Sequence, residues 1–217
     1  MEEICAGVEI YYTGKQGGQY LKTAFILCDD YTELTSKLFL LHTNPNWSDK
    51  NSNGRFKNYH AVLGEVKNNF NSNSSEYSQI DEIQNRMKER RTRRNNFFHS
   101  THLLNLNIYQ RDCIEAYLDL FCYGEILFST DWKNALEASR NIDSFLLLLQ
   151  LEQKSFSDPS LMYQVDDILR QWKCNKNRLP HNPKGCHVTS HPEDVYLRLC
   201  IIYGGQELRD KLTALLP

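Results

Sequence analysis

The chain has 217 residues, of which 41% are apolar and 24% charged, and its formal net charge at pH 7 is -2. This composition is typical of a globular domain with a sizeable core, and it excludes a uniformly basic nucleic-acid-binding chain. Only 10 glycines and 6 prolines are present, too few turn residues for an all-β fold. Any nucleic-acid contact must therefore depend on a local patch.

Apolar residues recur at three- and four-residue steps along most of the chain, a pattern that predicts helices. The first helix is expected over residues 19–42, with one apolar face made of Leu21, Ala24, Phe25, Cys28, Tyr31, Leu34, Leu38 and Leu41. Further helices are expected over 55–68, 77–98, 108–128, from the N-cap candidates at 129–131 to 151, and over 160–172, 193–203 and 206–215. We therefore expect an all-α antiparallel bundle, with residues 1–156 as the main domain and 157–217 as a helical C-terminal extension.

Seven cysteines are scattered along the chain without a CxxC pair, which favours a reducing compartment. No apolar run is long enough to cross a bilayer, and the acidic first residues lack the order of a signal peptide. The expectation is a cytoplasmic protein that makes no membrane contact.

One segment near the C-terminus gathers metal-ligand residue types within eighteen residues, namely Cys174, His181, Cys186, His187 and His191. Their spacing matches no familiar zinc pattern, and the intervening prolines and glycine are typical of a loop. The prediction is that the protein needs neither a metal nor another cofactor.

The densest charge cluster is RMKERRTRR at 86–94, with six cations and one glutamate in nine residues. A solvated helical face is the ordinary interpretation of such a run. Arg94, however, follows Ile80 and Met87 at steps of seven, so it continues their apolar stripe. Its guanidinium should point toward the bundle or a partner subunit and needs pairing there, whereas Arg90 and Arg93 can project outward.

The cluster leads directly into Asn95-Asn96-Phe97-Phe98-His99. Asn95 lies four residues before His99 and shares its face, whereas Arg94 lies about 140° away around an ideal helix. The two side chains can meet only if the helix ends or if the long arginine curls back. A histidine, an arginine and an amide beside a basic patch suit attack of a ribose 2′-OH on its own phosphodiester.

Arg94 and Asn95, with His99 four residues further on, in an all-helical chain resemble the Arg-x4-6-His motif of HEPN ribonucleases, and the likeness covers about residues 19–155. Arg93 also fits this spacing. The resemblance implies a HEPN-type bundle that dimerises into a composite cleft and cuts RNA without metal, leaving cyclic phosphate ends. It also implies a toxin, abortive-infection or phage-defence effector that can have an antitoxin or other regulatory partner. Thr101 stands where some such toxins have a modified tyrosine, so control through that residue is not expected.

The expected catalytic residues are therefore Arg94, Asn95 and His99, with Ser100 and His102 as candidate auxiliary residues. The expected RNA-binding residues are Arg86, Lys88, Arg90, Arg91 and Arg93. One alternative is a non-catalytic HEPN-like module that binds RNA or protein through the same cluster. Another is a purely structural bundle in which Arg94 forms an internal ion pair with Glu115 or Asp119.

Overall fold

The computed structural model describes residues 7–8, 10–11, 18–99, 106–129, 139–174 and 205–216. Its labelled elements are all helices, and these residues contain no strand apart from an isolated bridge between Lys50 and Phe56. The prediction of an all-α fold is confirmed. The helices are α2 (Gly18–Thr43), α3 (Tyr59–Lys67), α4 (Ser75–His99), α5 (Leu106–Phe128), α6 (Ser139–Ser155), α7 (Ser160–Cys174) and α9 (Gly205–Thr213).

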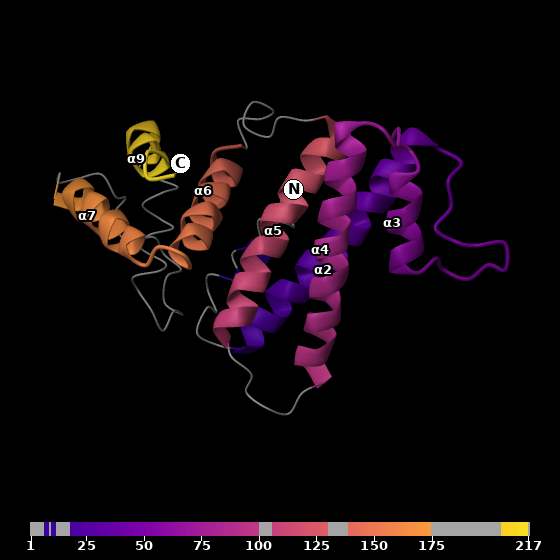
Figure 1. Ribbon diagram of the computed structural model, residues 1–217, viewed down its shortest axis with the longest axis horizontal. Helices are drawn as coiled ribbons and strands as arrows, with labels where there is room; N and C mark the ends of the chain where they lie inside the picture. Colours follow the sequence, from indigo (N-terminus) through magenta and orange to yellow (C-terminus); the bar gives the residue numbers. More distant parts are fainter. Residues whose placement is uncertain are drawn as a thin grey trace, which may run out of the picture.

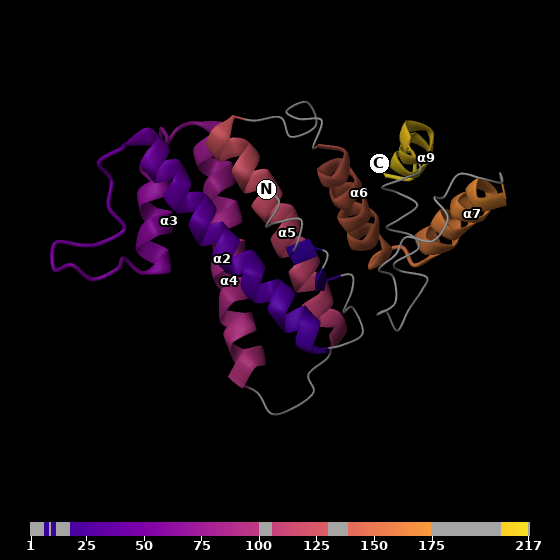
Figure 2. The same ribbon diagram turned by 180° about the vertical axis from the view of Figure 1, so that it is seen from behind.

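Helices α2, α4 and α5 form the centre of one bundle, with α3 against α2 and α4 (Figure 1). In Figure 1 α4 lies in front of α2, and in Figure 2 this order is reversed, so the two helices cross and pack one against the other. Helix α6 packs on α5, and α7 and α9 lie beyond it. Helix α4 therefore contacts α2, α3 and α5.

Two hydrophobic clusters hold these helices together. One joins the first half of α2 to α5, α6, α7 and α9, and the other joins the second half of α2 to α3, α4 and the end of α5. Fully buried side chains in the two clusters include Leu21, Ile114, Tyr117, Leu149 and Val165 in the first and Val62, Leu63, Ile80 and Tyr123 in the second. Burying such side chains is the main favourable term that holds the bundle together.

A buried chain of hydrogen bonds links four helices, α2, α3, α4 and α5, inside the second cluster. The Gln84 amide of α4 donates to the backbone carbonyl oxygen of Leu63 (2.9 Å) and to the Tyr123 hydroxyl oxygen (3.2 Å). The Tyr123 hydroxyl of α5 lies 3.1 Å from the Ser36 hydroxyl, which donates to the Thr32 carbonyl oxygen of α2. Because a buried polar group without a partner is costly, this chain restricts the rotation of α2, α4 and α5 relative to one another.

The prediction for α2 is correct in extent but wrong about its second half. Leu21, Ala24, Phe25 and Cys28 are buried as expected, whereas Leu34, Leu38 and Leu41 are 42%, 51% and 42% exposed. Over 26 residues an apolar pattern can move from one face to another. In the second half of α2 the inward positions belong to Thr32, Ser36, Phe39 and Leu40.

Helix α3 begins four residues later than the sequence predicted. The Asn58 side chain caps it by accepting a hydrogen bond from the Ala61 backbone N–H (2.9 Å), and Asn58 itself has extended backbone angles. Residues 55–57 therefore belong to the preceding loop. The helices expected over 77–98, 108–128, 160–172 and 206–215 correspond to α4, α5, α7 and α9.

The helix expected to end at residue 151 corresponds to α6, which ends four residues later. Of its expected N-cap candidates, Thr130 and Asp131 lie outside the described residues, as does the helix predicted over 193–203. The expected domain boundary after residue 156 falls between α6 and α7. Leu161 and Val165 of α7, with Leu208 and Leu212 of α9, pack into the same hydrophobic cluster as α6.

Candidate functional site

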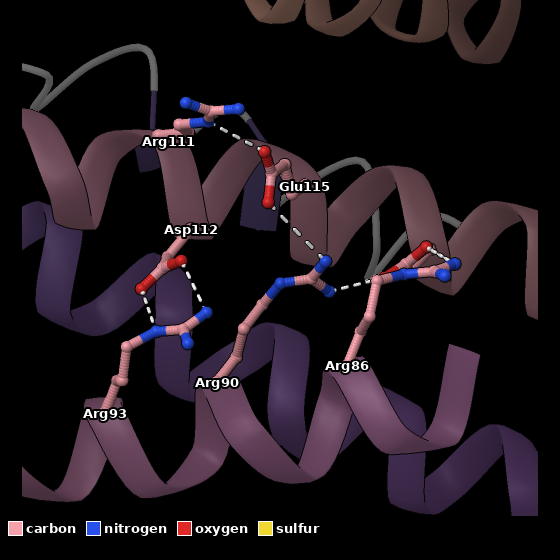
Figure 3. Close-up of polar contacts among 7 residues, drawn as sticks. Arg86, Arg90, Arg93, Arg111, Asp112 and Glu115 are labelled. Carbon is pink, nitrogen blue, oxygen red and sulfur yellow. Dashed lines mark hydrogen bonds and ion pairs between the residues drawn. The ribbon is translucent and has the colours of Figure 1, made fainter. Parts of the chain in front are cut away.

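Three arginines on one side of α4 face three carboxylates of α5 (Figure 3). Arg86 donates from Nε and Nη2 to the two carboxylate oxygens of Asp119, at 3.0 and 2.8 Å. Arg93 forms the same two-point contact with Asp112, at 2.7 and 2.8 Å. This planar pairing uses the fork of the guanidinium and is the strongest form of the arginine–carboxylate contact.

Arg90 lies between these two pairs and is almost completely buried. Its side chain is 4% exposed, with Nη1 2.5 Å from Asp119 and Nη2 3.7 Å from Glu115. The expectation that Arg90 projects outward is therefore wrong, because α5 covers it. Arg93, at 44% side-chain exposure, is only partly covered.

Two further arginines of α4 converge on Asp29 of α2. Arg91 donates to an Asp29 oxygen at 2.8 Å and lies over the Tyr59 ring, 4.1 Å from its centroid, and Arg94 binds the same oxygen. Burial raises the pKa of Asp29 even though both arginines act to lower it. The expectation that Arg94 points into the bundle and is paired there is confirmed. Its partner is Asp29, and not Glu115 or Asp119 as the structural alternative had suggested.

A different set of residues occupies the outer side of α4. Asn95 and His99 are exposed and Lys88 is half-buried, and their spacing of seven and four residues places them within about 40° of one another. His99 is the last residue of α4, which stays helical through the whole motif. Arg94 and His99 therefore point about 140° apart. Ser100 and His102 lie outside the described residues.

The structure thus divides the predicted site residues between two faces. Asn95 and His99 share the outer face, whereas Arg94 turns toward α2 and the arginines proposed to bind RNA are paired within the chain. Each cation of the run 86–94 other than Lys88 has an ion pair with a described carboxylate. The cluster is therefore much less electropositive than its sequence indicates.

The sequence offered Glu115 and Asp119 only as partners of Arg94, whereas they pair with Arg86 and Arg90, and it did not point to Asp29 or Asp112. The spacing of the α5 carboxylates nevertheless carries a signal. Arg86, Arg90 and Arg93 follow one another at steps of four and three residues. Asp119, Glu115 and Asp112, read in the opposite direction, repeat the same steps. Two helices with such mirrored spacing can pair along one face when they run antiparallel, as α4 and α5 do.

A groove of about 970 Å³ lies between α4, α5 and α6. One wall carries Arg86, Arg90, Glu115 and Asp119, and the other carries Leu146, Gln150 and Gln153. The charged groups of the first wall are already paired with one another, and the carboxylate of Glu125 also lines the groove. Its chemistry does not select a particular class of ligand.

The described residues contain no cluster of three or more histidine, cysteine or acidic side chains that could hold a metal ion. Of the metal-ligand residue types noted near the C-terminus, Cys174 is the last residue of α7, and the other four lie outside the described residues. None of the described helices is both long and apolar enough to cross a membrane. Compared with known proteins, the chain matches no family model, and no curated protein or solved structure is significantly similar to it.

Proposed function

We propose that this chain is a metal-independent endoribonuclease of the HEPN type that acts as a toxin or phage-defence effector. The observation that carries the proposal is the arrangement of α4. Asp29 holds the Arg94 guanidinium in place, and five residues later the exposed His99 imidazole ends the same helix. A fixed guanidinium can stabilise charge on a phosphate and an accessible imidazole can transfer protons, and RNA transesterification uses both roles.

In the proposed reaction, an imidazole takes the proton of the ribose 2′-OH, whose oxygen attacks the adjacent phosphorus. The bond from phosphorus to the 5′ oxygen breaks, which leaves a 2′,3′-cyclic phosphate and a 5′-hydroxyl end. A protonated imidazole supplies the proton that the leaving oxygen takes up. Arg94 stabilises the charge that builds on the phosphate, and Asn95 orients His99 or a phosphate oxygen.

One copy of the chain holds these groups on different sides of α4, so the proposal requires a second copy. In a homodimer, His99 of one subunit can approach a phosphate held by the other. The two imidazoles of such a cleft can also divide the roles of base and acid. Lys88 and the partly exposed Arg86, Arg91 and Arg93 are the cations that remain accessible to an RNA backbone.

A second candidate is a non-catalytic HEPN-like module that binds RNA or protein. The pairing of five arginines with carboxylates of the same chain favours the protein-binding form of this candidate, because groups committed to holding helices together contribute less to phosphate binding. On this proposal Arg94 stabilises the contact between α4 and α2. Replacing Arg94 would then lower the free energy of unfolding, and the RNA would stay intact with the wild type and with the variant.

The two candidates are separated by incubating the purified protein with single-stranded RNA in the presence of EDTA and analysing the ends. The wild type should leave cyclic phosphates, and His99→Ala should abolish cleavage with an unfolding free energy within about 0.5 kcal/mol of the wild type, because His99 is exposed. Arg94→Ala should abolish it as well, while circular dichroism shows unchanged helical content. The matched control is His60→Ala, an exposed histidine on α3, which should cleave normally.

Retained cleavage in His99→Ala would exclude the assigned site. If the wild type does not cleave RNA and only Arg94→Ala loses stability, the non-catalytic candidate replaces the enzymatic one.

A further inference from the structure

The connection between α2 and α3, residues 44–58, extends from the bundle on the side away from α6, α7 and α9 (Figures 1 and 2). It contains a turn, residues 50–56, whose two ends are joined by the antiparallel bridge between Lys50 and Phe56. We call residues 50–56 the loop tip. Every residue of the loop tip is exposed, so the tip is open to a partner from outside the chain.

Hydrogen bonds to the backbone hold the loop tip in shape. The Asn51 backbone N–H donates to the Arg55 carbonyl oxygen (2.8 Å), and the Asn51 side-chain oxygen accepts from the backbone N–H groups of Asn53 (3.0 Å) and Arg55 (3.1 Å). Gly54 has a φ of 73°, an angle that residues with a side chain rarely adopt. Because the tip is shaped before a ligand arrives, binding does not carry the entropic cost of ordering it.

The base of this connection is fixed to α3 through one carboxylate. The Glu65 carboxylate accepts hydrogen bonds from the Trp47 indole N–H (2.6 Å) and from the Lys57 ammonium (2.9 Å), which also lies 4.9 Å from the Trp47 ring centroid. Asp49, which precedes the tip, lies 3.9 Å from the Lys37 ammonium. Positions 50–60 contain no acidic residue. The loop tip itself therefore carries no carboxylate that would repel a polyanion.

The loop tip presents one aromatic ring and two cations. Phe56 is 69% exposed and belongs to neither hydrophobic cluster, so it does not hold the helices together. The Lys50 ammonium lies over its ring, 5.2 Å from the centroid. Neither Lys50 nor Arg55 forms an ion pair with a described residue, whereas five arginines of α4 are paired within the chain. The two cations of the tip are thus available to a ligand.

An exposed ring with cations beside it is an arrangement by which proteins bind single-stranded nucleic acids. A base stacks on the ring and the cations contact phosphates, with little dependence on base sequence. A protein partner matches the tip less well, because Phe56 is its only apolar side chain. Aromatic anchors of protein interfaces are surrounded by further well-packed contacts, which this tip does not offer.

Residues 49–54 also have the D-x-N-x-N-G order of the first half of a calcium-binding loop. Such a loop ends at its twelfth position with a glutamate that binds the ion through both oxygens. The twelfth position here is His60, and Asp49 is the only carboxylate between positions 49 and 60. Lys50 and Arg55 would also repel a divalent cation. The charges of the loop tip therefore favour an anion.

We propose that the loop tip binds single-stranded nucleic acid, with a base stacked on Phe56 and the neighbouring phosphates at Lys50 and Arg55. The site uses none of the residues assigned to RNA cleavage on α4, so it does not depend on the ribonuclease proposal. Stacking and phosphate contacts are common to DNA and RNA. DNA, which has no 2′-OH to attack, therefore probes this site without being cleaved by the proposed reaction.

Stacking is tested by fluorescence anisotropy with a labelled oligothymidylate of about 12 nucleotides at about 50 mM salt, in the presence of EDTA. Phe56→Ala and Phe56→Leu should each raise the Kd about tenfold, because both remove the ring although leucine keeps an apolar side chain. Phe56→Trp should bind at least as tightly as the wild type. The matched control is Tyr163→Ala, which removes a ring of α7 that is 78% exposed and should leave the Kd unchanged.

The phosphate contacts are tested by the double variant Lys50→Gln/Arg55→Gln. Each phosphate contact on a single strand contributes about 0.7 to the slope of log Kd against log salt concentration, so this slope should fall by about 1.4. Phe56→Ala should leave the slope unchanged, because it removes no charge. All the substituted residues are exposed, so circular dichroism and thermal unfolding should match the wild type.

A wild type that does not bind the probe at about 100 µM protein would overturn the proposal, as would Phe56→Ala binding as tightly as the wild type. If Phe56→Leu binds like the wild type while Phe56→Ala does not, the tip is an apolar contact and not a stacking site. An unchanged salt slope in the double variant would exclude Lys50 and Arg55 as the phosphate contacts.

Discussion

Helix α4 has an inner side, where five arginines contact carboxylates of α2 and α5, and an outer side, where Asn95 and His99 are exposed. In the sequence these residues form one continuous run. In the fold, the inner residues contribute to how the helices hold together, and the outer ones are free to meet a ligand. The density of charge along a sequence therefore does not measure the charge that a surface presents.

The largest expected effect comes from removing the carboxylate that Arg86 and Arg90 share. Asp119→Ala leaves Arg90 buried with only Glu115 nearby, and losing one partner of a buried pair costs on the order of 3 kcal/mol. Urea denaturation followed by circular dichroism measures this loss. Glu89→Ala, which removes an exposed carboxylate of α4, is the control and should change the unfolding free energy by less than about 0.5 kcal/mol.

A paired substitution sharpens this test. Arg90→Met/Asp119→Leu should recover most of the stability that Asp119→Ala loses, because it removes both buried charges together. If the double variant is as unstable as Asp119→Ala, the loss comes from packing and not from an unpaired charge.

A smaller effect of opposite sign is expected at Asp29. Because burial raises its pKa in the folded state, its contribution to stability is fully present below its unfolded pKa of about 4 and is lost as pH rises through the folded pKa. The Asp29→Asn side chain does not ionise, so the variant does not lose this stability as the pH rises. At pH 7 it should therefore be as stable as the wild type or more stable by up to about 1 kcal/mol, and this advantage should disappear at acidic pH.

The same variant probes function, since Asp29 holds Arg94. On the ribonuclease proposal, Asp29→Asn should lower RNA cleavage at pH 7 without lowering stability. Thermal unfolding between pH 4 and 8 and a cleavage assay measure the two effects separately, and Asp167→Asn on the exposed side of α7 is the control. An Asp29→Asn protein that unfolds much more easily than the wild type at pH 7 would show that the two ion pairs outweigh burial.

The smallest effect concerns an ion pair on the surface between α3 and α4. A hydrogen bond from Lys67 (2.7 Å) lowers the pKa of Asp81. The pair therefore contributes stability above the unfolded pKa of about 4 and loses it as pH falls through the lowered folded pKa. Both side chains reach solvent, so Asp81→Asn should cost no more than about 0.5 kcal/mol at pH 7 and nothing at low pH. If Asp81→Asn lowers the free energy of unfolding as much as Asp119→Ala does, buried and surface ion pairs do not differ in their contribution to stability.

The parts of the fold that the sequence predicts well depend on local periodicity. The extent of α4, its buried stripe through Ile80 and Met87 and the inward direction of Arg94 follow from spacing along one helix. The partners of its arginines could not be predicted in this way, because Asp29 and Asp119 lie on other helices. Which face of α2 or α5 meets α4 is decided by packing between helices, as the exposed Leu34 and Leu38 also show.

The uneven spacing of the ion pairs between α4 and α5 limits how these helices can move. If α4 slid along α5 by one turn in one direction, Arg90 would face Arg111 and Arg93 would face Ile108. In the other direction, Arg86 would face Tyr123 and Arg93 would face Ala116. Either displacement breaks at least two of the three contacts, so sliding has no neighbouring position of similar energy. His99 therefore lies at the end of a helix that cannot move along its axis by one turn relative to α5.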